Sequence, residues 1–297
     1  MNKKYTYFIT CSLIWGLTWI AIKFQLGHGD ANVAVFYRFA LATIIMFGLA
    51  VIKREPFQYT RFQHVLMMAQ GFFMFCLNFL LTYWGSSMAP SALISLAFTS
   101  LIFFNMIGGR IFLKLPLEKK VIFGALISFI GMALIAWNEL QAFESEKYPL
   151  SMWGFLLSLV GTVSASAGNL VSAKNRTLGL PIISNTAFGM MYGSLFTLIF
   201  CLSRGLNFSL NVDLPFSISF FYLTVFGTVI SFISYLKLIQ IVGPSKAAFT
   251  SVVSPVIALT ISTFYEGMGW SWPLAIGVIF CLAGNVVALA SNFRRLS

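Results

Sequence analysis

The stretch "GPSKAAFTSVVSPVIAL" at residues 243–259 decides the fold. It is apolar enough to cross a membrane, yet it carries several hydroxyl side chains and a proline in its middle. A similar stretch, "APSALISLAFTSLIFFN" at residues 89–105, lies 154 residues earlier and also begins with Pro-Ser. Two such helices at a fixed spacing indicate a chain that is built from two related halves.

The composition places both stretches in a membrane. Of 297 residues, 59% are hydrophobic and only 9% are charged, and the mean hydropathy is +0.88. A helix that spans a bilayer needs about 20 predominantly apolar residues. The sequence therefore predicts an all-α membrane protein with ten transmembrane helices. We expect them at residues 5–25, 31–52, 64–86, 90–112, 120–138, 151–173, 183–203, 217–240, 245–265 and 271–291.

The halves are predicted to be inverted repeats. At the offset of 154, "LTYWGSSMAPSA" (81–92) aligns with "YLKLIQIVGPSK" (235–246). Five spans in each half place the second half upside down in the membrane, an arrangement that recurs in secondary transporters. We expect a first repeat at 5–138, an external linker at 139–149 and a second repeat at 150–291.

The net charge of +11 follows the predicted topology. With the N-terminus in the cytoplasm, internal segments hold fifteen of the 19 Lys and Arg residues, external segments hold Lys23, Lys147 and Arg204, and Arg38 lies inside the second span. This positive-inside bias predicts that both termini are cytoplasmic. The basic charge is therefore a topology signal, and we expect no nucleic-acid partner.

Polar residues form stripes on one face of six predicted spans. Because polar side chains in lipid are costly, such stripes favour a shared polar cavity. Each hydroxyl could instead bond to its own helix, which is the common structural alternative. The stripes are Ser12, Gly16 and Trp19 beside Trp15 and Thr18; Asn78, Thr82 and Gly85; Ser91, Ser95 and Thr99; Ser158, Thr162, Ser166 and Asn169; Thr224, Thr228, Ser231 and Tyr235; and Ser251, Ser254 and Ser262.

The fifth and tenth spans have a different pattern. They carry glycines seven residues apart, Gly124 with Gly131 and Gly277 with Gly284, and few hydroxyls, which suits close helix packing. The four cysteines lie in predicted spans without paired spacing, so we expect buried free thiols and neither a metal site nor a cofactor.

Five segments together resemble a known family. They are "IWGLTWIAIK" (14–23), "YRFALA" (37–42), "LNFLLTYWGSSMAPSALISL" (77–96), "VFGTVISFISYLKLIQIVGPSKAAF" (225–249) and "SPVIALTISTFYEG" (254–267). In this order they resemble the EamA-type branch of the drug/metabolite transporter superfamily. The resemblance implies a ten-helix exporter of amino acids or other small metabolites in a bacterial inner membrane. It also implies a cavity lined mainly by the first, third, fourth, sixth, eighth and ninth helices.

The resemblance also extends to single positions. Trp15-Gly16 matches the family's Trp-Gly, Arg38 its Arg-Phe, and Pro255 and Glu266 the residues that bracket the ninth helix. In the first half the sequence departs from the pattern, with Leu101 at the proline and Leu113 or Phe112 at the glutamate. This departure argues against an indispensable role for Glu266.

Two kinds of charged group are missing from the centres of the predicted spans. No Asp or Glu lies near the centre of any predicted span, which disfavours exchange of protons for cationic drugs. No basic cluster lies at mid-depth, which disfavours phosphorylated solutes. A cavity of hydroxyls, amides and aromatic rings suits a neutral or zwitterionic solute, such as an amino acid or a nucleobase-like metabolite.

The candidate residues follow from the stripes and the resemblance. For substrate binding they are Trp15, Trp19, Asn78, Tyr83, Ser95, Thr99, Thr162, Ser166, Asn169, Thr228, Ser231, Tyr235 and Ser254. For gating or coupling they are Arg38, Pro255 and Glu266, each with a structural alternative: carbonyl pairing for Arg38, a packing kink for Pro255, and capping or pairing for Glu266.

Other classes of function fit less well. An intramembrane enzyme would need paired acids, a Gly-x-Ser-x-Gly or a His-Glu-x-x-His motif, and the chain has only His28 and His64, near helix ends. A channel would need a ring of charges or a carbonyl filter. A cation or multidrug efflux carrier and a solute sensor remain alternatives. We expect an inner-membrane exporter with a small-molecule substrate, working as a monomer or as a homodimer through the tenth helix.

Overall fold

The computed structural model describes residues 3–25, 27–89, 94, 97–140, 150–254, 256–257 and 272–289. Within these ranges the chain is helical and forms no strand. The helices are α1 (Lys3–Lys23), α2 (Ala31–Ile52), α3 (Arg61–Gln70), α4 (Asn78–Met88), α6 (Leu101–Leu113), α7 (Lys119–Leu140), α8 (Ser151–Thr177), α9 (Ile182–Ser203), α10 (Leu214–Thr224), α11 (Ser231–Val242), α12 (Pro244–Ala247) and α14 (Trp272–Leu289), with the π-helices η1 (Gly71–Leu77) and η3 (Val225–Ile230).

Five helices in the described part of the chain are long and apolar enough to cross a membrane. They run over Ala31–Ile52, Arg61–Met88, Met152–Thr177, Ile182–Ser203 and Leu214–Val242, and they agree with five predicted spans. Shorter apolar helices lie at Ala97–Leu113 and Ala275–Ala288, while α1 and α7 occupy the predicted first and fifth positions. Of the predicted ninth span, residues 245–254, 256 and 257 are described, while Pro255 and residues 258–265 lie outside the described residues. The count of ten spans and the side of the termini stay predictions.

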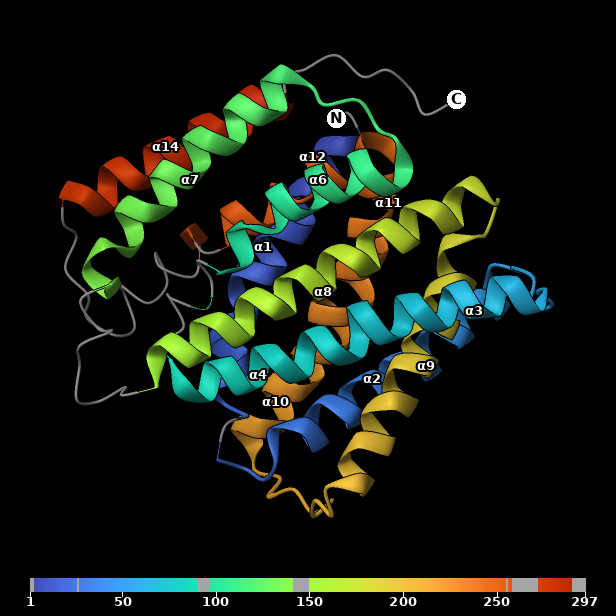
Figure 1. Ribbon diagram of the computed structural model, residues 1–297. Coiled ribbons are helices and arrows are strands. Elements are labelled where there is room, and N and C mark those ends of the chain that lie inside the picture. The colour runs from blue at the N-terminus through green and yellow to red at the C-terminus, as the bar shows by residue number, and fades with distance from the viewer. Residues whose placement is uncertain are drawn as a thin grey trace.

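Helices from the two halves pack against each other in a symmetric pattern (Figure 1). α2 packs on α9 and α7 on α14, so the second and fifth helices of each half meet their counterparts. α4 packs on α8, and the equivalent pair after exchange of the halves, α11 with α1, is also in contact. The pairing therefore maps onto itself when the halves are exchanged, as a two-fold relation requires.

Both halves contain a π-helix at the same place. η1 begins at Gly71 and η3 at Val225, which are 154 residues apart, the offset of the sequence repeat. Each π-helix joins two α-helices into one continuous span, α3–η1–α4 and α10–η3–α11. The turn of a π-helix is wider than that of an α-helix and interrupts the α-helical hydrogen-bond pattern. Such widened turns are frequently found at functional sites.

The glycines of α7 and α14 confirm the predicted close packing. A Cβ on Gly131 would lie 2.6 Å from the carbonyl oxygen of Gly277, and one on Gly124 would lie 2.6 Å from that of Gly284. Only hydrogen at these positions lets the two backbones approach so closely. Figure 1 shows α7 and α14 side by side at one edge of the molecule.

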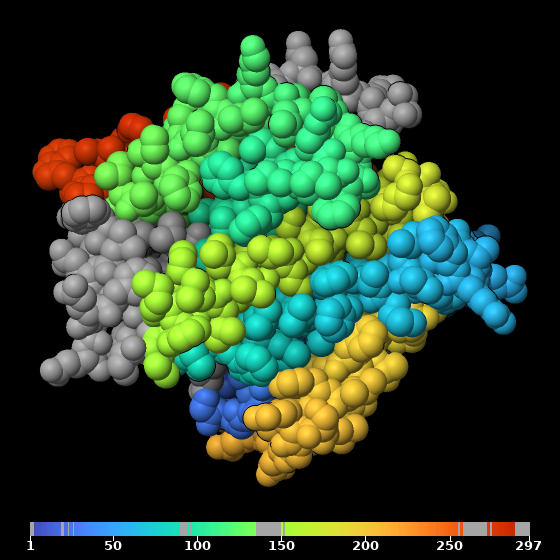
Figure 2. Space-filling view, in the orientation of Figure 1, coloured from blue at the N-terminus to red at the C-terminus, as the bar shows by residue number. Residues whose placement is uncertain are grey.

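The outer surface is apolar, as a surface in contact with lipid must be. On α8, Trp153, Val160 and Val163 are exposed, although the same helix lies between α6 and α4 (Figure 2). Inside, one hydrophobic cluster joins α1, α2, α9 and α11, and a second joins α6, α7 and α14. All four cysteines are free and buried, as predicted.

Ionic contacts hold the ends of several helices. Asp213 precedes α10, where its carboxylate accepts a hydrogen bond from the Phe216 amide at 2.8 Å and lies 3.0 Å from Nε2 of His28. The Phe216 amide and then His28 lower the pKa of the Asp213 carboxyl. At another helix end, Lys246 of α12 pairs with Glu118 at 2.8 Å.

Replacing Asp213 with asparagine tests this helix start. Asparagine still caps a helix, so the change removes mainly the charge. Because the folded pKa is lowered, the carboxylate stabilises the fold above its unfolded pKa of about 3.9, and this contribution is lost as the pH falls through the lower folded value. We expect the variant to melt below the wild type at pH 7, by a difference in melting temperature that narrows as the pH is lowered toward 3. Thermal unfolding across pH checks this, and an equal gap at both pH values would contradict it.

Candidate functional site: a central cavity

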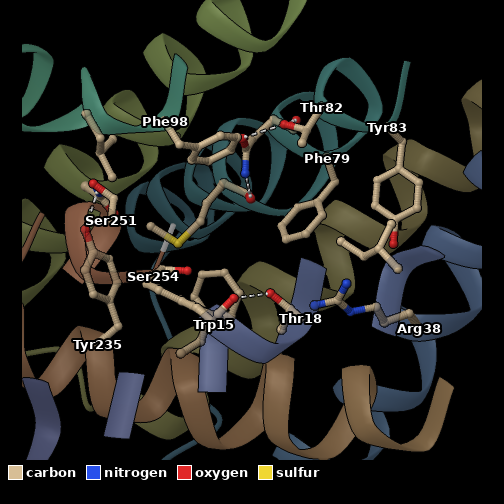
Figure 3. A pocket seen from close by; sticks show the side chains of 17 residues that line it. Trp15, Thr18, Arg38, Phe79, Thr82, Tyr83, Phe98, Tyr235, Ser251 and Ser254 are labelled. Atoms are coloured by element: carbon tan, nitrogen blue, oxygen red, sulfur yellow. Dashed lines mark hydrogen bonds between the residues drawn. The ribbon is translucent and has the colours of Figure 1, made fainter. Parts of the chain in front are cut away.

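A cavity of about 130 Å³ lies between the two halves (Figure 3). It is close in size to an engineered cavity of about 150 Å³ that takes up benzene. Its walls come from α1, α2, η1, α4, α6, α8, α11 and the segments around Phe98 and Ser251. The lining residues are Trp15, Thr18, Ile22, Arg38, Met74, Asn78, Phe79, Thr82, Tyr83, Phe98, Leu101, Ala165, Asn169, Phe232, Tyr235, Ser251 and Ser254.

One end of the cavity holds the guanidinium of Arg38. Its side chain is 2% exposed, and Nε donates to Oγ1 of Thr228 at 2.7 Å. Nη2 lies 3.5 Å from the Gly227 carbonyl oxygen. The guanidinium carbon lies 5.2 Å from the ring centroid of Phe79, a cation–π distance. Figure 3 shows Tyr83 at the same end.

The opposite end carries a network of amides and a phenol. Nδ2 of Asn169 donates to the Tyr235 hydroxyl at 2.9 Å and to Oδ1 of Asn105 at 3.4 Å. Nδ2 of Asn105 in turn donates to the carbonyl oxygen of Pro244 at 3.0 Å. The network therefore ties α8 and α11 of the cavity wall to α6 and to the start of α12.

Aromatic rings form the wall between the two ends. The ring of Trp15 lies 4.9 Å from that of Tyr235 and 5.5 Å from that of Phe232, centroid to centroid. Nε1 of Trp15 donates to the Gly227 carbonyl oxygen at 3.2 Å, which fixes the indole against η3. A cavity with polar ends and an aromatic middle can orient a small solute that has one apolar part.

The structure brings seven of the candidate residues together around this cavity. They are Trp15, Arg38, Asn78, Tyr83, Asn169, Tyr235 and Ser254. Three others, Ser95, Pro255 and Glu266, and the side chain of Trp19 lie outside the described residues. Their roles stay predictions.

Five candidates do not line the cavity. Thr99 and Ser166 are buried and are not among the lining residues. Thr162 donates to the Ser158 carbonyl oxygen of its own helix at 2.8 Å. Thr228 and Ser231 each donate to a carbonyl oxygen five residues earlier: Thr228 to that of Leu223 in α10 at 2.8 Å, and Ser231 to that of Phe226 in η3 at 2.7 Å. These three hydroxyls make the bonds that the structural alternative expects, and a role in substrate binding stays a prediction for each.

Ten lining residues were not among the candidates. Thr18, Thr82 and Ser251 belonged to the predicted stripes, and most of the others are apolar. Several lie three or four residues from a candidate on the same helix, such as Met74 from Asn78, Ala165 from Asn169 and Phe232 from Tyr235. A position three or four residues away from a polar candidate was therefore the sequence signal that could have identified these residues.

Among the described residues, no group of three metal-ligating side chains lies together.

A second polar cluster lies away from the cavity, where Nδ2 of Asn175 donates to Gln70 and Asn185 at 2.8 and 3.0 Å. Asn185 also donates to Gln70 at 3.0 Å, so three carboxamides link α3, α8 and α9. This cluster supports helix packing.

Comparison with known proteins gives a consistent pattern. The model of the EamA-like transporter family matches the chain twice, over residues 2–137 and 152–290. Protein PagO of Salmonella typhimurium is 22% identical over 97% of this chain and 95% of its own length. The uncharacterized inner membrane transporter YedA of Escherichia coli K12 is 23% identical over 90% of this chain and 85% of its own. A solved crystal structure with 15% identity matches 97% of this chain and 96% of its own with a TM-score of 0.75, which shows the fold.

Proposed function

Since the chain belongs to the EamA-like transporter family, part of the drug/metabolite transporter superfamily, we propose that it exports small neutral or zwitterionic metabolites by alternating access. The solutes in this proposal are amino acids or nucleobase-like compounds, and the membrane is a bacterial inner membrane. The relative YedA, which is named as an inner membrane transporter, supports that location.

The observation that carries the proposal is the lining of the central cavity. It lies where the halves meet, and its described lining includes two asparagines, four hydroxyl residues of the Ser/Thr type, two phenols and several apolar aromatic rings, but no carboxylate. A carrier that exchanges protons for a lipophilic cation needs an acidic group at its binding site. The lining therefore favours solutes without a net positive charge, and cation efflux becomes an outcome of the test.

Counterflow in liposomes tests the proposal. Purified protein is reconstituted into vesicles that are preloaded with one unlabelled solute, and uptake of the same labelled solute is followed with and without a pH gradient. The panel holds phenylalanine, leucine, threonine, adenine, uracil, tetraphenylphosphonium and glucose 6-phosphate. We expect saturable counterflow by an amino acid or a nucleobase. Uptake of the cation or the sugar phosphate alone would contradict the proposal, and flux without saturation or counterflow would indicate a channel.

A pair of tryptophan variants links the flux to the cavity. Trp15→Ala removes an aromatic wall, and we expect it to abolish counterflow. Trp153→Ala is the matched control, because Trp153 is 64% exposed on the lipid-facing side of α8, and we expect it to keep the wild-type rate. Equal loss in both would show that tryptophan removal acts on folding rather than on the cavity. Export is then tested in cells, where overproduction should lower the internal level of the transported solute.

A further inference from the structure

Arg38 is a buried cation without a counter-ion among the described residues. Its Nη1 is buried and has no hydrogen-bond partner. The acceptors of its other nitrogens are a hydroxyl and a carbonyl, both uncharged. Phe79 covers one side of the guanidinium, and the uncharged phenol of Tyr83 interacts with it. The positive charge is therefore solvated by dipoles and aromatic rings alone.

The carboxylates whose side chains the structure describes are all engaged elsewhere. Asp30 caps α2 through the Asn32 amide, and Asp213 holds the start of α10 and lies against His28. Glu55 accepts from the Ser184 amide at 2.7 Å, and Glu118 pairs with Lys246. None of these four acids neutralises Arg38.

An unpaired charge at this depth carries a large desolvation penalty. Taking an ion out of water costs several kcal/mol even after relaxation, and ionisable residues inside membranes usually have a partner. Arg38 is also the one charged residue among the described residues that line the cavity. The missing partner can therefore enter with the solute.

We propose that the transported solute carries a carboxylate and that this carboxylate binds the guanidinium of Arg38. This inference rests on the proposed function and narrows it from neutral or zwitterionic solutes to carboxylate-bearing ones. Arg presents its N–H donors in a planar fork that matches the two oxygens of a carboxylate. The apolar part of the solute then lies against Trp15, Phe232 and Tyr235.

Other anions and uncharged solutes fit this end of the cavity less well. A phosphate ester carries close to two negative charges, and the described lining offers a single cation. A nucleobase is uncharged and would leave Arg38 unpaired in the loaded state. A monoanionic carboxylate balances the one guanidinium charge, and the aromatic wall accepts a hydrocarbon side chain.

Two series of analogues test the proposal on the unaltered protein. The first is phenylalanine, phenylalaninamide, phenethylamine and 3-phenylpropionate, and the second is leucine, leucinamide, isoamylamine and 4-methylpentanoate. Affinity is measured by thermal stabilisation of the detergent-purified protein over a range of concentrations. In at least one series we expect the two carboxylates to bind about 30-fold or more tightly than the amide and the amine. If amides or amines bind as well as the acids, or if neither series binds, the proposal is wrong.

Variants then assign the effect to Arg38. Arg38→Gln keeps the polar stem and removes the charge, and we expect carboxylate affinity to fall about 30-fold or more. Arg38→Lys keeps the charge without the fork and should retain part of the affinity. Arg204→Gln makes the same chemical change at an exposed position and serves as the control. Unchanged preference for the acid over its amide in Arg38→Gln would overturn the assignment.

Different results would overturn the proposed function and the binding of a carboxylate by Arg38. Counterflow by adenine or uracil with no preference for carboxylates would keep the proposed function and overturn this inference. Absence of counterflow by every solute in the panel, together with tight binding of the carboxylates, would overturn the proposed function and keep the binding of a carboxylate at Arg38. Because the analogue series needs no variant, a folding defect in Arg38→Gln leaves the test intact.

Discussion

Replacing Gly131 with leucine is expected to separate α7 from α14 and to destabilise the protein by about 3 kcal/mol. A Cβ at this position would lie 2.6 Å from the Gly277 carbonyl oxygen and 2.7 Å from the Cys281 amide nitrogen. Both are backbone atoms, so the strain cannot be relieved by a side-chain rotation. Thermal unfolding of the purified protein in detergent measures the effect.

Gly48→Leu is the control for this change. Gly48 lies in α2, and a Cβ there would meet nothing within 4 Å. The same increase in side-chain volume should therefore leave the melting temperature of the protein within a degree or two of the wild type. Similar losses in both variants would mean that the close approach of α7 and α14 is not what limits stability.

The second large effect is expected from Asn169→Leu, which should lower counterflow on the order of 100-fold. The change removes the donor to the Tyr235 hydroxyl and to Oδ1 of Asn105. It also turns one polar end of the cavity apolar. Initial counterflow rates at equal amounts of folded protein check the prediction.

Asn175→Leu provides the matched control on the same helix. It also removes an asparagine that donates two hydrogen bonds, but in the cluster with Gln70 and Asn185, outside the cavity lining. We expect a comparable loss of stability and little loss of counterflow. Equal loss of counterflow would place the effect of Asn169 in helix packing and not in the cavity.

Much of the fold could be predicted from the sequence because the deciding signals are local. The lengths of the apolar stretches predicted the five spans that the structure describes as long enough to cross a membrane, and the offset of 154 predicted two related halves. The third helix begins earlier than predicted, at Arg61, because Thr60 and Gln63 form a capping box. The π-helices were not predicted, since "GFFMFCL" (71–77) has the composition of an ordinary apolar helix. A widened turn depends on tertiary packing, which periodicity does not reveal.

The site was predicted less completely, for a physical reason. Asn169 and Tyr235 were found because amides and phenols need partners that their own helix rarely supplies, and here they bond to each other. Thr162 is not among the lining residues, and its hydroxyl bonds to a carbonyl of the preceding turn, a bond that a sequence stripe cannot distinguish from a cavity contact. Phe79 and Phe232 were missed because an aromatic ring in a membrane helix has the same appearance whether it faces lipid, protein or a cavity.

The matched π-helices also bear on the history of the chain. A π-helix is related to an α-helix by one inserted residue, and η1 and η3 begin 154 residues apart, at the offset that relates the halves. Two separate insertions at equivalent positions would be a coincidence. One insertion in an ancestral gene for a single half, followed by duplication and fusion, accounts for both. Such a history requires that the insertion was already present in the single half before it was duplicated.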